Sequence, residues 1–435
     1  MANQLQAPRG TLDVLPDKVY QWQYVESAMR DTAAAFGFRE IRFPTFEYTE
    51  LFSRGVGETT DVVQKEMYTF EDRGGRSVTL RPEGTASTVR LVLQNGLHNE
   101  PLPLKLFYLI SCFRGEKPQA GRYREFHQFG AEVFGSADPA ADAEVISLAK
   151  SLFDTLGIDR LRLEINSIGC PECRKNYHKA LREYFEQHAD GLCETCRGRL
   201  ERNPMRILDC KSAECKKIAE DAPKVLDYIC DDCRTHFDQV KARLSSCQIN
   251  FTVNPSIVRG LDYYTRTVFE FIDDNDGLTV CGGGRYDGLV EQLGGPRLPA
   301  LGFGLGLERL LMVMESRGCS FDKKEGQRVY LAPMGMNASQ KAAELVRLLR
   351  EEGFTAEYDL MGRSVKAQMK FADKRGFDYT AVIGDNELSE SKAMLRNMKT
   401  GAVGEIPLDS GIVSAFYRIT QKDALEGLCD SVRDS

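Results

Sequence analysis

The chain has 435 residues, of which 42% are hydrophobic and 28% are charged, and its formal net charge is −7. This composition is typical of a globular protein with about two to four domains, and it excludes a uniformly basic protein that coats nucleic acid through bulk charge. The N-terminus lacks the apolar core of a signal peptide, and the longest apolar strand-like run, Leu106–Ile110, is too short to cross a membrane. We therefore expect a cytoplasmic protein whose 13 cysteines are thiols or metal ligands rather than disulfides.

The first and largest block of the chain extends to about residue 325 and contains strand-like segments between glycine-rich turns. Residues 105–114 predict one buried strand, and residues 126–134 predict another whose two faces differ in polarity. Because side chains alternate between faces along a strand, Gln128 and Glu132 share one face, and the other face is apolar (Phe129, Ala131, Val133). This pattern predicts a strand that forms the floor of a polar pocket, although an ordinary half-exposed strand would give the same pattern.

A cysteine-rich segment, residues 169–248, interrupts this block. Nineteen residues separate its first two cysteine pairs, a spacing that is typical of zinc sites. Four pairs could supply two four-thiolate zinc sites, although reduced thiols in a small helical insertion are the alternative. The pairs are Cys170 and Cys173, Cys193 and Cys196, Cys210 and Cys215, and Cys230 and Cys233.

The remaining cysteines and the histidines of this segment are not expected to bind metal. We expect the three histidines at the protein surface, and the other cysteines as ordinary thiols. The histidines are His178, His188 and His236, and the cysteines are Cys112, Cys247, Cys281, Cys319 and Cys429.

From about residue 328 onward the chain predicts a small α/β domain, because strand, helix, strand, helix and strand patterns follow one another. Apolar residues at helical spacing predict the first helix, which Gly353 would end. The second helix, residues 364–375, would end at Gly376. Its basic residues favour an RNA-binding face, although a solvated helix face is the alternative; they are Arg363, Lys366, Lys370, Lys374 and Arg375.

The common signatures of nucleotide-binding loops and of serine or cysteine nucleophiles are absent from the sequence. With only five histidines, three of them in the cysteine-rich segment, an enzyme of this sequence would work through positioning and electrostatics. Arginines beside glycine-rich turns fit that expectation, because planar guanidinium groups suit carboxylates and phosphates. Singly, each arginine is more often a surface or ion-pair residue, but together they predict a site for a polyanion: Arg114, Arg122, Arg124, Arg259 and Arg309.

Three segments resemble the three motifs of class II aminoacyl-tRNA synthetases and occur in the same order. Residues 40–68, with Pro44, resemble motif 1, which forms the dimer interface of these enzymes. Residues 113–135, which begin FRGE and continue through GRYREFHQFGAEVFG, resemble motif 2, and GFGLGLERL (302–310) resembles motif 3.

Four further segments resemble the histidyl-tRNA synthetases in particular: PRGTLDVLP near the N-terminus, RPEGTAS (81–87), RGLDYY (259–264) and CGGGRYDGL (281–289). The resemblance implies an α+β fold in which helices flank an antiparallel sheet. It implies a catalytic domain in two parts (1–168 and 249–325), an insertion domain (169–248) and an α/β anticodon-binding domain (328–425).

The implied activity is that of a homodimeric histidine–tRNA ligase. Such an enzyme activates L-histidine with Mg²⁺–ATP and transfers it to the 3′ end of tRNA(His). Activation needs no general base, because an α-carboxylate with a pKa of about 3.3–3.7 is already a nucleophile at neutral pH.

The resemblance also implies a role for individual residues. Arg114 would hold the α-phosphate, and Arg259 would bridge that phosphate and the histidine carboxylate. Further ATP contacts would come from Glu116, Arg122, Phe126 beneath the adenine, and Arg309. The histidine amino group would meet Glu83, Thr85 and Gln128, and the imidazole would meet Glu132 and Tyr264, with Tyr263 lining the same pocket. The loop of residues 117–122 is the implied reader of the tRNA 5′ end.

Three other functions are compatible with parts of the sequence. The synthetase-like regulatory subunit of ATP phosphoribosyltransferase keeps the fold, but residues 328–420 and the intact Arg114, Arg259 and Arg309 speak against it. Synthetases for threonine, proline or glycine have a similar last domain but are disfavoured by RGLDYY and CGGGRYDGL. A non-enzymatic RNA-binding module would not need the arginines.

Overall fold

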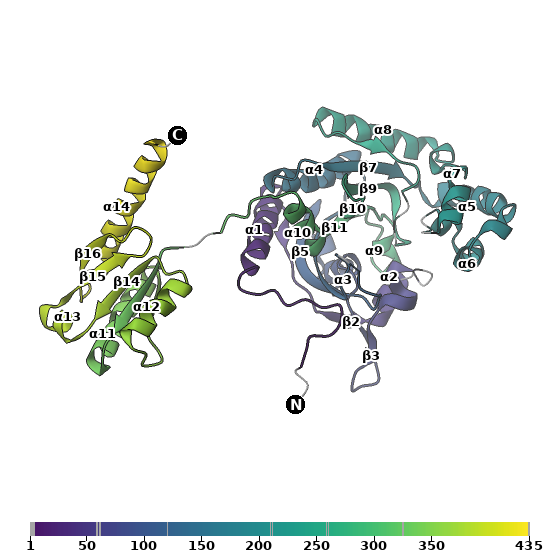
Figure 1. Cartoon of the computed structure of the whole chain (residues 1–435). Coiled ribbons are helices and arrows are strands. Elements are labelled where there is room, and N and C mark those ends of the chain that lie inside the picture. The colour runs from purple at the N-terminus through teal and green to yellow at the C-terminus, as the bar shows by residue number, and fades with distance from the viewer. Residues whose placement is uncertain are drawn as a thin grey trace. The chain divides into compact units, whose positions relative to one another are not determined.

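The computed structural model describes residues 5–57, 60, 62–119, 121–208, 210, 212–257, 259, 261–323 and 326–433, with side chains as far as residue 423. Several expectations fall partly outside these residues: residues 58, 59 and 61 of the motif 1-like segment, residue 120 of the loop, Gly260 of RGLDYY, and the Cys429 side chain. The chain divides into two compact units, Met1–Lys323 and Lys324–Ser435 (Figure 1). Among the described residues, no helix is both long and apolar enough to cross a membrane.

The first unit is built on an eight-stranded sheet, which is antiparallel except for the outermost pair at each edge. The antiparallel sheet flanked by helices confirms the predicted fold class. The strands, in spatial order, are β1 (Arg39–Glu40), β5 (Leu104–Phe113), β6 (Glu125–Phe134), β11 (Ala300–Gly306), β10 (Thr279–Arg285), β9 (Thr265–Asp273), β7 (Leu161–Ser167) and β8 (Thr252–Val253).

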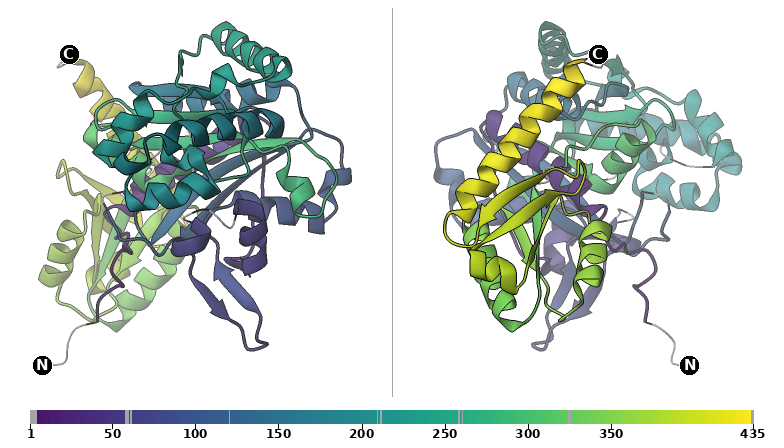
Figure 2. Two further views of the ribbon diagram at one scale, coloured as in Figure 1. Left: turned by 90° about the vertical axis from the view of Figure 1, so that its right-hand side faces the viewer. Right: turned by 60° about the vertical axis from the view of Figure 1, so that its left-hand side comes forward.

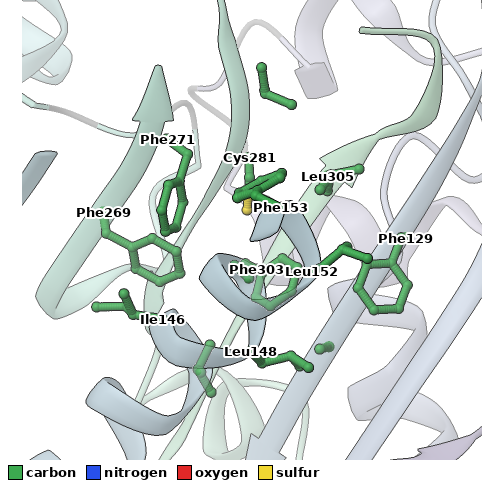
Figure 3. Packing of buried hydrophobic residues seen from close by; sticks show 14 of the residues in the cluster. Phe129, Ile146, Leu148, Leu152, Phe153, Phe269, Phe271, Cys281, Phe303 and Leu305 are labelled. Carbon is green, nitrogen blue, oxygen red and sulfur yellow. The ribbon is translucent and has the colours of Figure 1, made fainter. Parts of the chain in front are cut away.

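One face of this sheet carries the main hydrophobic core. The predicted alternation along β6 is confirmed, because Phe129, Ala131 and Val133 are all buried in this core. Phe269 and Phe271 of β9 reach the same layer, and Figure 3 shows these rings beside residues of α4. The helices that contribute to the core are α1 (Val19–Ala35), α4 (Pro139–Thr155), α8 (Asp231–Ser246) and α10 (Leu307–Ser316).

A small antiparallel sheet extends from the first unit in the region that resembles motif 1 (Figure 1). Its strands, in spatial order, are β2 (Phe46–Tyr48), β4 (Ser77–Leu80) and β3 (Thr69–Glu71). Phe46, Tyr48 and Phe70 are each about half exposed there, at 55%, 54% and 48%. Helix α2 (Thr49–Val56) packs against β2 and β4, and it contacts α3 (Thr85–Gln94) and α9 (Leu289–Gln292), which also contact each other.

The cysteine-rich segment folds as helices α5 (Pro171–Glu186), α6 (Glu194–Arg202) and α7 (Ala213–Glu220), followed by α8. Figure 2 shows these helices at one side of the sheet. The expectation that His236 lies at the surface is wrong: it is only 5% exposed, and its Nε2 lies 3.3 Å from the Asp142 carboxylate. The reason is that α8 packs along α4, which buries the inner face of α8.

The second unit has a five-stranded sheet in the order β13 (Thr355–Tyr358), β12 (Arg328–Pro333), β14 (Tyr379–Ile383), β15 (Lys392–Asn397) and β16 (Val403–Pro407). The first three are the predicted parallel strands, whereas β15 and β16 are antiparallel and were not predicted. Helices α11 (Met336–Glu351) and α14 (Ile412–Arg433) share one hydrophobic cluster with the sheet, and α12 (Val365–Lys374) packs in another. A short helix, α13 (Asp385–Glu390), follows β14.

Candidate active site

A cleft of about 650 Å³ lies over the face of the large sheet that is opposite the core. Its floor is made of glycines, because Gly282 of β10 pairs with Gly304 of β11 on one side and with Glu270 of β9 on the other. A Cβ atom on Gly282 would lie 2.4 Å from Nη1 of Arg259, and one on Gly304 would lie 2.4 Å from Nε2 of Gln128. The missing side chains therefore make room for polar groups directly above the sheet.

Arg259 crosses this glycine floor and is held by Glu270. Its Nη1 donates to the Glu270 carboxylate, whose other oxygen accepts a hydrogen bond of 3.0 Å from Thr279 Oγ1. Burial opposes the positive charge, but the Glu270 carboxylate outweighs this effect and raises the pKa of Arg259. Nε of Arg259 is buried and has no hydrogen-bond partner among the described residues. The guanidinium is thus fixed in place by Glu270 while its Nε–H stays unused.

Three more arginines line the cleft, namely Arg114, Arg122 and Arg309. The Arg114 guanidinium lies 3.8 Å from the ring centroid of Phe126, and its Nε donates to the Tyr123 carbonyl. Burial and the neighbouring charges of Arg122 and Arg309 lower the pKa of Arg114 to about 10. Burial and Arg122 likewise lower the pKa of Arg309. Mutual repulsion among these cations means that a polyanion would stabilise all three.

Glu116 pairs with one of these arginines. Arg122 Nη2 donates to Glu116 at 2.7 Å, and Glu66 lies on the other side of the pair, 3.7 Å from Arg122. Burial and the nearby Glu116 raise the pKa of Glu66. A neutral Glu66 would leave Glu116 as the charged partner of Arg122, so the cleft keeps a net positive charge.

Beside the cleft, Glu132 forms the centre of a buried polar pocket. It is fully buried, and it accepts hydrogen bonds from Thr85 Oγ1 (2.8 Å), Tyr108 OH (3.1 Å) and Tyr286 OH (2.6 Å). Burial raises the pKa of Glu132 to about 8, although the three hydroxyl groups act in the opposite direction. No cation pairs with this carboxyl group among the described residues. A ligand that donates an N–H to it would satisfy a group that folding has left poorly compensated.

The remaining pocket residues come from α3 and from the segment that follows Arg259. Glu83 accepts the backbone N–H groups of Thr85 and Ala86, at 2.6 and 2.9 Å, and so caps α3. Tyr263 and Tyr264 are buried with their rings 4.8 Å apart, and Tyr263 also packs on Tyr286. Burial raises the pKa of both Tyr263 and Tyr264, so their phenols are neutral donors at pH 7.

The structure brings most of the predicted residues to this region. Those that line the cleft are Arg114, Arg122, Phe126, Gln128, Arg259 and Arg309. Glu132, Thr85 and Glu83 are linked by hydrogen bonds in the adjoining pocket. Arg124 is not among the cleft-lining residues, since its Nε donates to the Glu116 carbonyl.

Sequence reasoning missed four residues of the site: Tyr108, Glu270, Tyr286 and Glu308. Glu270 could have been found, because it alternates with Phe269 and Phe271 along β9 as Glu132 does along β6. Glu308 accepts the backbone N–H of His127 at 2.8 Å, a contact between β6 and α10 that no local pattern predicts. Tyr108 reaches Glu132 from β5, and Tyr286 reaches it from the position directly after β10, so the two residues are far apart in sequence.

An antiparallel sheet with a glycine floor, an arginine-lined cleft, and motif-like segments that form the neighbouring inner strands β6 and β11 defines a class II aminoacyl-tRNA synthetase. Residues 10–310 match the family model described as histidyl-tRNA synthetase, and residues 328–413 match the one described as anticodon binding domain. The chain belongs to the histidyl-tRNA synthetase family.

Individual relatives agree with this family. The histidine–tRNA ligase of Caldicellulosiruptor bescii is 55% identical over 92% of this chain and 95% of its own length. That of Acetivibrio thermocellus is 54% identical over 93% and 98%. The crystal structure of apo histidyl-tRNA synthetase from Staphylococcus aureus has a TM-score of 0.80 at 39% identity and covers 95% of this chain and 100% of its own.

Proposed function

We propose that the protein is a histidine–tRNA ligase, which forms histidyl-adenylate from L-histidine and Mg²⁺–ATP and transfers the histidine to the 3′ end of tRNA(His). The observation that carries this proposal is that two sites adjoin along β6, a cleft lined by four arginines and Gln128 and a buried carboxyl pocket centred on Glu132. Arginine clusters suit a triphosphate, and the pocket suits a small N–H donor.

In the histidine pocket, Glu132 would accept an N–H of the imidazole, and this hydrogen bond would compensate the burial of the carboxyl group. Tyr264 would face the other side of the ring, and Tyr263 would line the same pocket. Glu83, Thr85 and Gln128 would receive the amino group. Each oxygen of Glu83 accepts one backbone N–H in the structure, which leaves a second lone pair on each for the ligand.

In the cleft, Arg114 would contact the α-phosphate of ATP, and Arg122, Arg309 and Glu116 would meet the outer part of the nucleotide. Phe126 would stack beneath the adenine. The α-phosphate and the histidine carboxylate would both lie against Arg259, whose unused Nε and fixed guanidinium suit a bridging role. Negative charge gathers between these groups only as they react, so a preorganised cation stabilises the transition state more than the separate substrates.

The second unit would bind the anticodon of the tRNA. Lys366, Lys370 and Lys374 follow one another at four-residue spacing along α12, and all three are exposed. Residues four apart lie on the same face of a helix, so these lysines form a basic stripe that suits a phosphate backbone.

The enzyme would act in the cytoplasm as a homodimer. The apolar surface that a partner subunit would cover consists of Phe46 and Tyr48 of β2, in the segment that resembles motif 1, and of Phe70 on β3 of the same sheet. Burial of such a surface favours association.

The main alternative is a regulatory subunit that keeps the fold without aminoacylation. A structure titled as an ATP phosphoribosyltransferase regulatory subunit/histidyl-tRNA synthetase, from Bacillus halodurans C, shares the fold with a TM-score of 0.63 at 22% identity. The arginine set of the cleft and the match of residues 328–413 to the anticodon binding domain favour the ligase.

Exchange of labelled pyrophosphate into ATP, measured with each of the twenty amino acids, tests this function. We expect exchange that depends on histidine and on magnesium. Exchange driven best by threonine, proline or glycine would assign a different synthetase, and no exchange with any amino acid would favour the regulatory subunit.

A further inference from the structure

The four cysteine pairs of the insertion combine into two compact groups. The outer tetrad joins the first and last pairs (Cys170, Cys173, Cys230, Cys233), and the inner tetrad joins the two middle pairs (Cys193, Cys196, Cys210, Cys215). We propose that each tetrad binds one zinc ion and that the inner ion holds one wall of the catalytic cleft.

The sulfur positions fit a single tetrahedral ion. Within each tetrad all four sulfur atoms lie within 4.8 Å of one another, and individual separations are 3.5 Å (Cys170 to Cys173), 4.0 Å (Cys173 to Cys233) and 3.9 Å (Cys193 to Cys210). A tetrahedron of thiolates with zinc–sulfur bonds of about 2.3 Å has edges of about 3.8 Å. A disulfide would need about 2.05 Å, and all the cysteines of both tetrads are free. The thiolates of a multi-iron cluster bind different metal atoms and would have to lie farther apart.

The local backbone favours thiolates over thiols. Cys170, Cys193 and Cys230 occupy the N-cap positions of α5, α6 and α8, where the unpaired N–H groups of a helix stabilise negative charge. One backbone N–H group in each tetrad also donates to a sulfur atom: that of Cys230 donates to Cys173 at 3.1 Å in the outer tetrad, and that of Cys193 donates to Cys215 at 3.3 Å in the inner tetrad. Hydrogen bonds of this kind orient metal ligands from the second layer of contacts.

The nesting of the tetrads explains what the ions would do for the fold. The outer tetrad ties the start of α5 to the start of α8, which closes the whole insertion, and the inner tetrad ties α6 to α7 within it. Ordering so long a loop costs conformational entropy. A bound zinc ion supplies folding free energy for such a segment directly.

The inner tetrad reaches the active site. Cys210 itself lines the cleft, together with its neighbours Leu208 and Lys216. This wall, formed by Leu208, Cys210 and Lys216, comes from the insertion and lines the same cleft as the four arginines. An ion bound to Cys210 would therefore fix the position of the wall relative to α6 and α7.

Metal content tests the first part of the proposal without any substrate. The full chain should hold two zinc ions by elemental analysis. It would be produced in cells grown with added zinc and purified under reducing conditions without chelator. Cys173→Ser and Cys196→Ser should each hold one, whereas the control Cys247→Ser, at an exposed thiol outside both tetrads, should hold two. A parent chain with no zinc, or with iron in its place, would overturn the proposal, as would variants that all keep two ions.

Titration of the thiols in the folded parent protein gives a second test, which does not depend on whether the variants fold. A mercurial reagent should release two zinc ions into a colorimetric indicator as the eight tetrad thiols react, in addition to accessible thiols such as Cys247. Cobalt added to the stripped protein should give the visible absorption of tetrahedral tetrathiolate coordination. Full reaction of the thiols with no released metal, in protein reconstituted with zinc, would contradict two zinc sites.

The second part rests on the proposed binding of ATP in the cleft. Mg²⁺–ATP should slow the mercurial release of one of the two zinc ions by at least about twofold, because Cys210 lines the cleft. Cys196→Ser, which lacks the inner ion, should release its single zinc at a rate that ATP does not change. If both sites release zinc at equal rates with ATP present, in a preparation whose pyrophosphate exchange shows that it binds ATP, the inner ion does not hold a wall of the cleft.

Discussion

The burial of the Glu132 carboxyl group lowers the stability of the folded protein when this group is ionised. Its pKa is about 8 in the folded chain because it is buried, against a usual value of 4.5. The folded state therefore binds a proton more tightly than the unfolded state, so this group lowers stability as pH rises from about 4.5 to about 8. A structural residue gains nothing from such an arrangement, but a residue that binds a ligand through an N–H does.

Replacement of Glu132 by Gln should separate binding from folding. The variant should lose roughly 10–100-fold in kcat/KM for histidine in pyrophosphate exchange, since a neutral amide replaces a carboxyl group whose ionised form a bound N–H donor would favour. Above pH 8 it should unfold at a temperature equal to or higher than the parent, because the buried charge is gone. Thermal unfolding from pH 5 to pH 9 measures this effect. A variant that is destabilised at pH 9 yet activates histidine normally would assign Glu132 a structural role only.

Arg259 is held by a carboxylate and keeps one donor unused, which suits a catalytic contact. Arg259→Ala should reduce histidine-dependent exchange by about 10²–10³-fold, the usual effect of removing one preorganised donor. The affinity for ATP alone, measured by equilibrium dialysis, should change far less. Glu270→Gln is the matched variant. It keeps Arg259 but weakens the contact that holds the guanidinium, so we expect a smaller loss of exchange rate. Exchange at the parent rate in Arg259→Ala would disprove the catalytic assignment of this segment.

At the scale of elements, the strands β6, β9, β10 and β11 position the site through their alternation. The sequence predicted this for β6, because Gln128 and Glu132 stand out against Phe129, Ala131 and Val133. It did not predict Glu270 beside Arg259, although Glu270 alternates with Phe269 and Phe271 along β9. The antiparallel strands β15 and β16 were also not predicted, because polar and exposed residues along β15 leave it only a weak apolar pattern. Motif resemblance located the arginines, whereas only the fold shows that their charges are mutually unfavourable.

The insertion illustrates the same limit. Cysteine spacing predicted pairs of metal ligands, but it did not show that the first and last pairs lie together in one tetrad. The burial of His236 was also missed, because a single histidine on a polar helix carries no local signal. Its burial depends on α4, which supplies Asp142 and thereby meets both His236 and the fully buried Arg285.

Two glycines of β11 should respond differently to alanine. A Cβ on Gly304 would meet the movable end of Gln128, so Gly304→Ala should fold but push that side chain into the cleft and raise the KM for ATP or histidine. A Cβ on Gly302 would meet Glu132 at 1.7 Å and the Ala131 carbonyl at 2.5 Å, and backbone cannot move so easily. Gly302→Ala should therefore lose about 1–3 kcal/mol of stability. Denaturant unfolding measures the stability of both variants, and pyrophosphate exchange measures their KM values. Equal stability of the two variants would contradict the expected difference.

For the molecule as a whole, the two units allow the two half-reactions to be tested apart. Replacing Lys366, Lys370 and Lys374 together by Ala should weaken tRNA charging and reduce the salt dependence of tRNA binding by about one unit of slope for each phosphate that a lysine no longer neutralises. Pyrophosphate exchange should remain at the parent rate, because activation needs no tRNA. Arg363 is a poorer target, since it pairs with the buried Asp359 and stacks 4.1 Å from the Phe371 ring centroid. Exchange that fell in parallel with charging would argue against separate roles.

The exposed aromatic residues of the small sheet lead to the last prediction. Phe46 and Tyr48 lie on β2, about half exposed, in the segment that resembles the dimer-forming motif. If a second copy of the chain covers them, a buried charge there would be costly, so Phe46→Asp should shift the protein from dimer to monomer at micromolar concentration in light scattering.

Met394→Asp, at a residue 52% exposed on β15 of the other unit, is the matched control and should leave the dimer intact. Because α2 and α3 join this sheet to Glu83 and Thr85, the monomer should also activate histidine more slowly than the dimer. A parent chain that is monomeric and fully active would contradict the dimer and this coupling together.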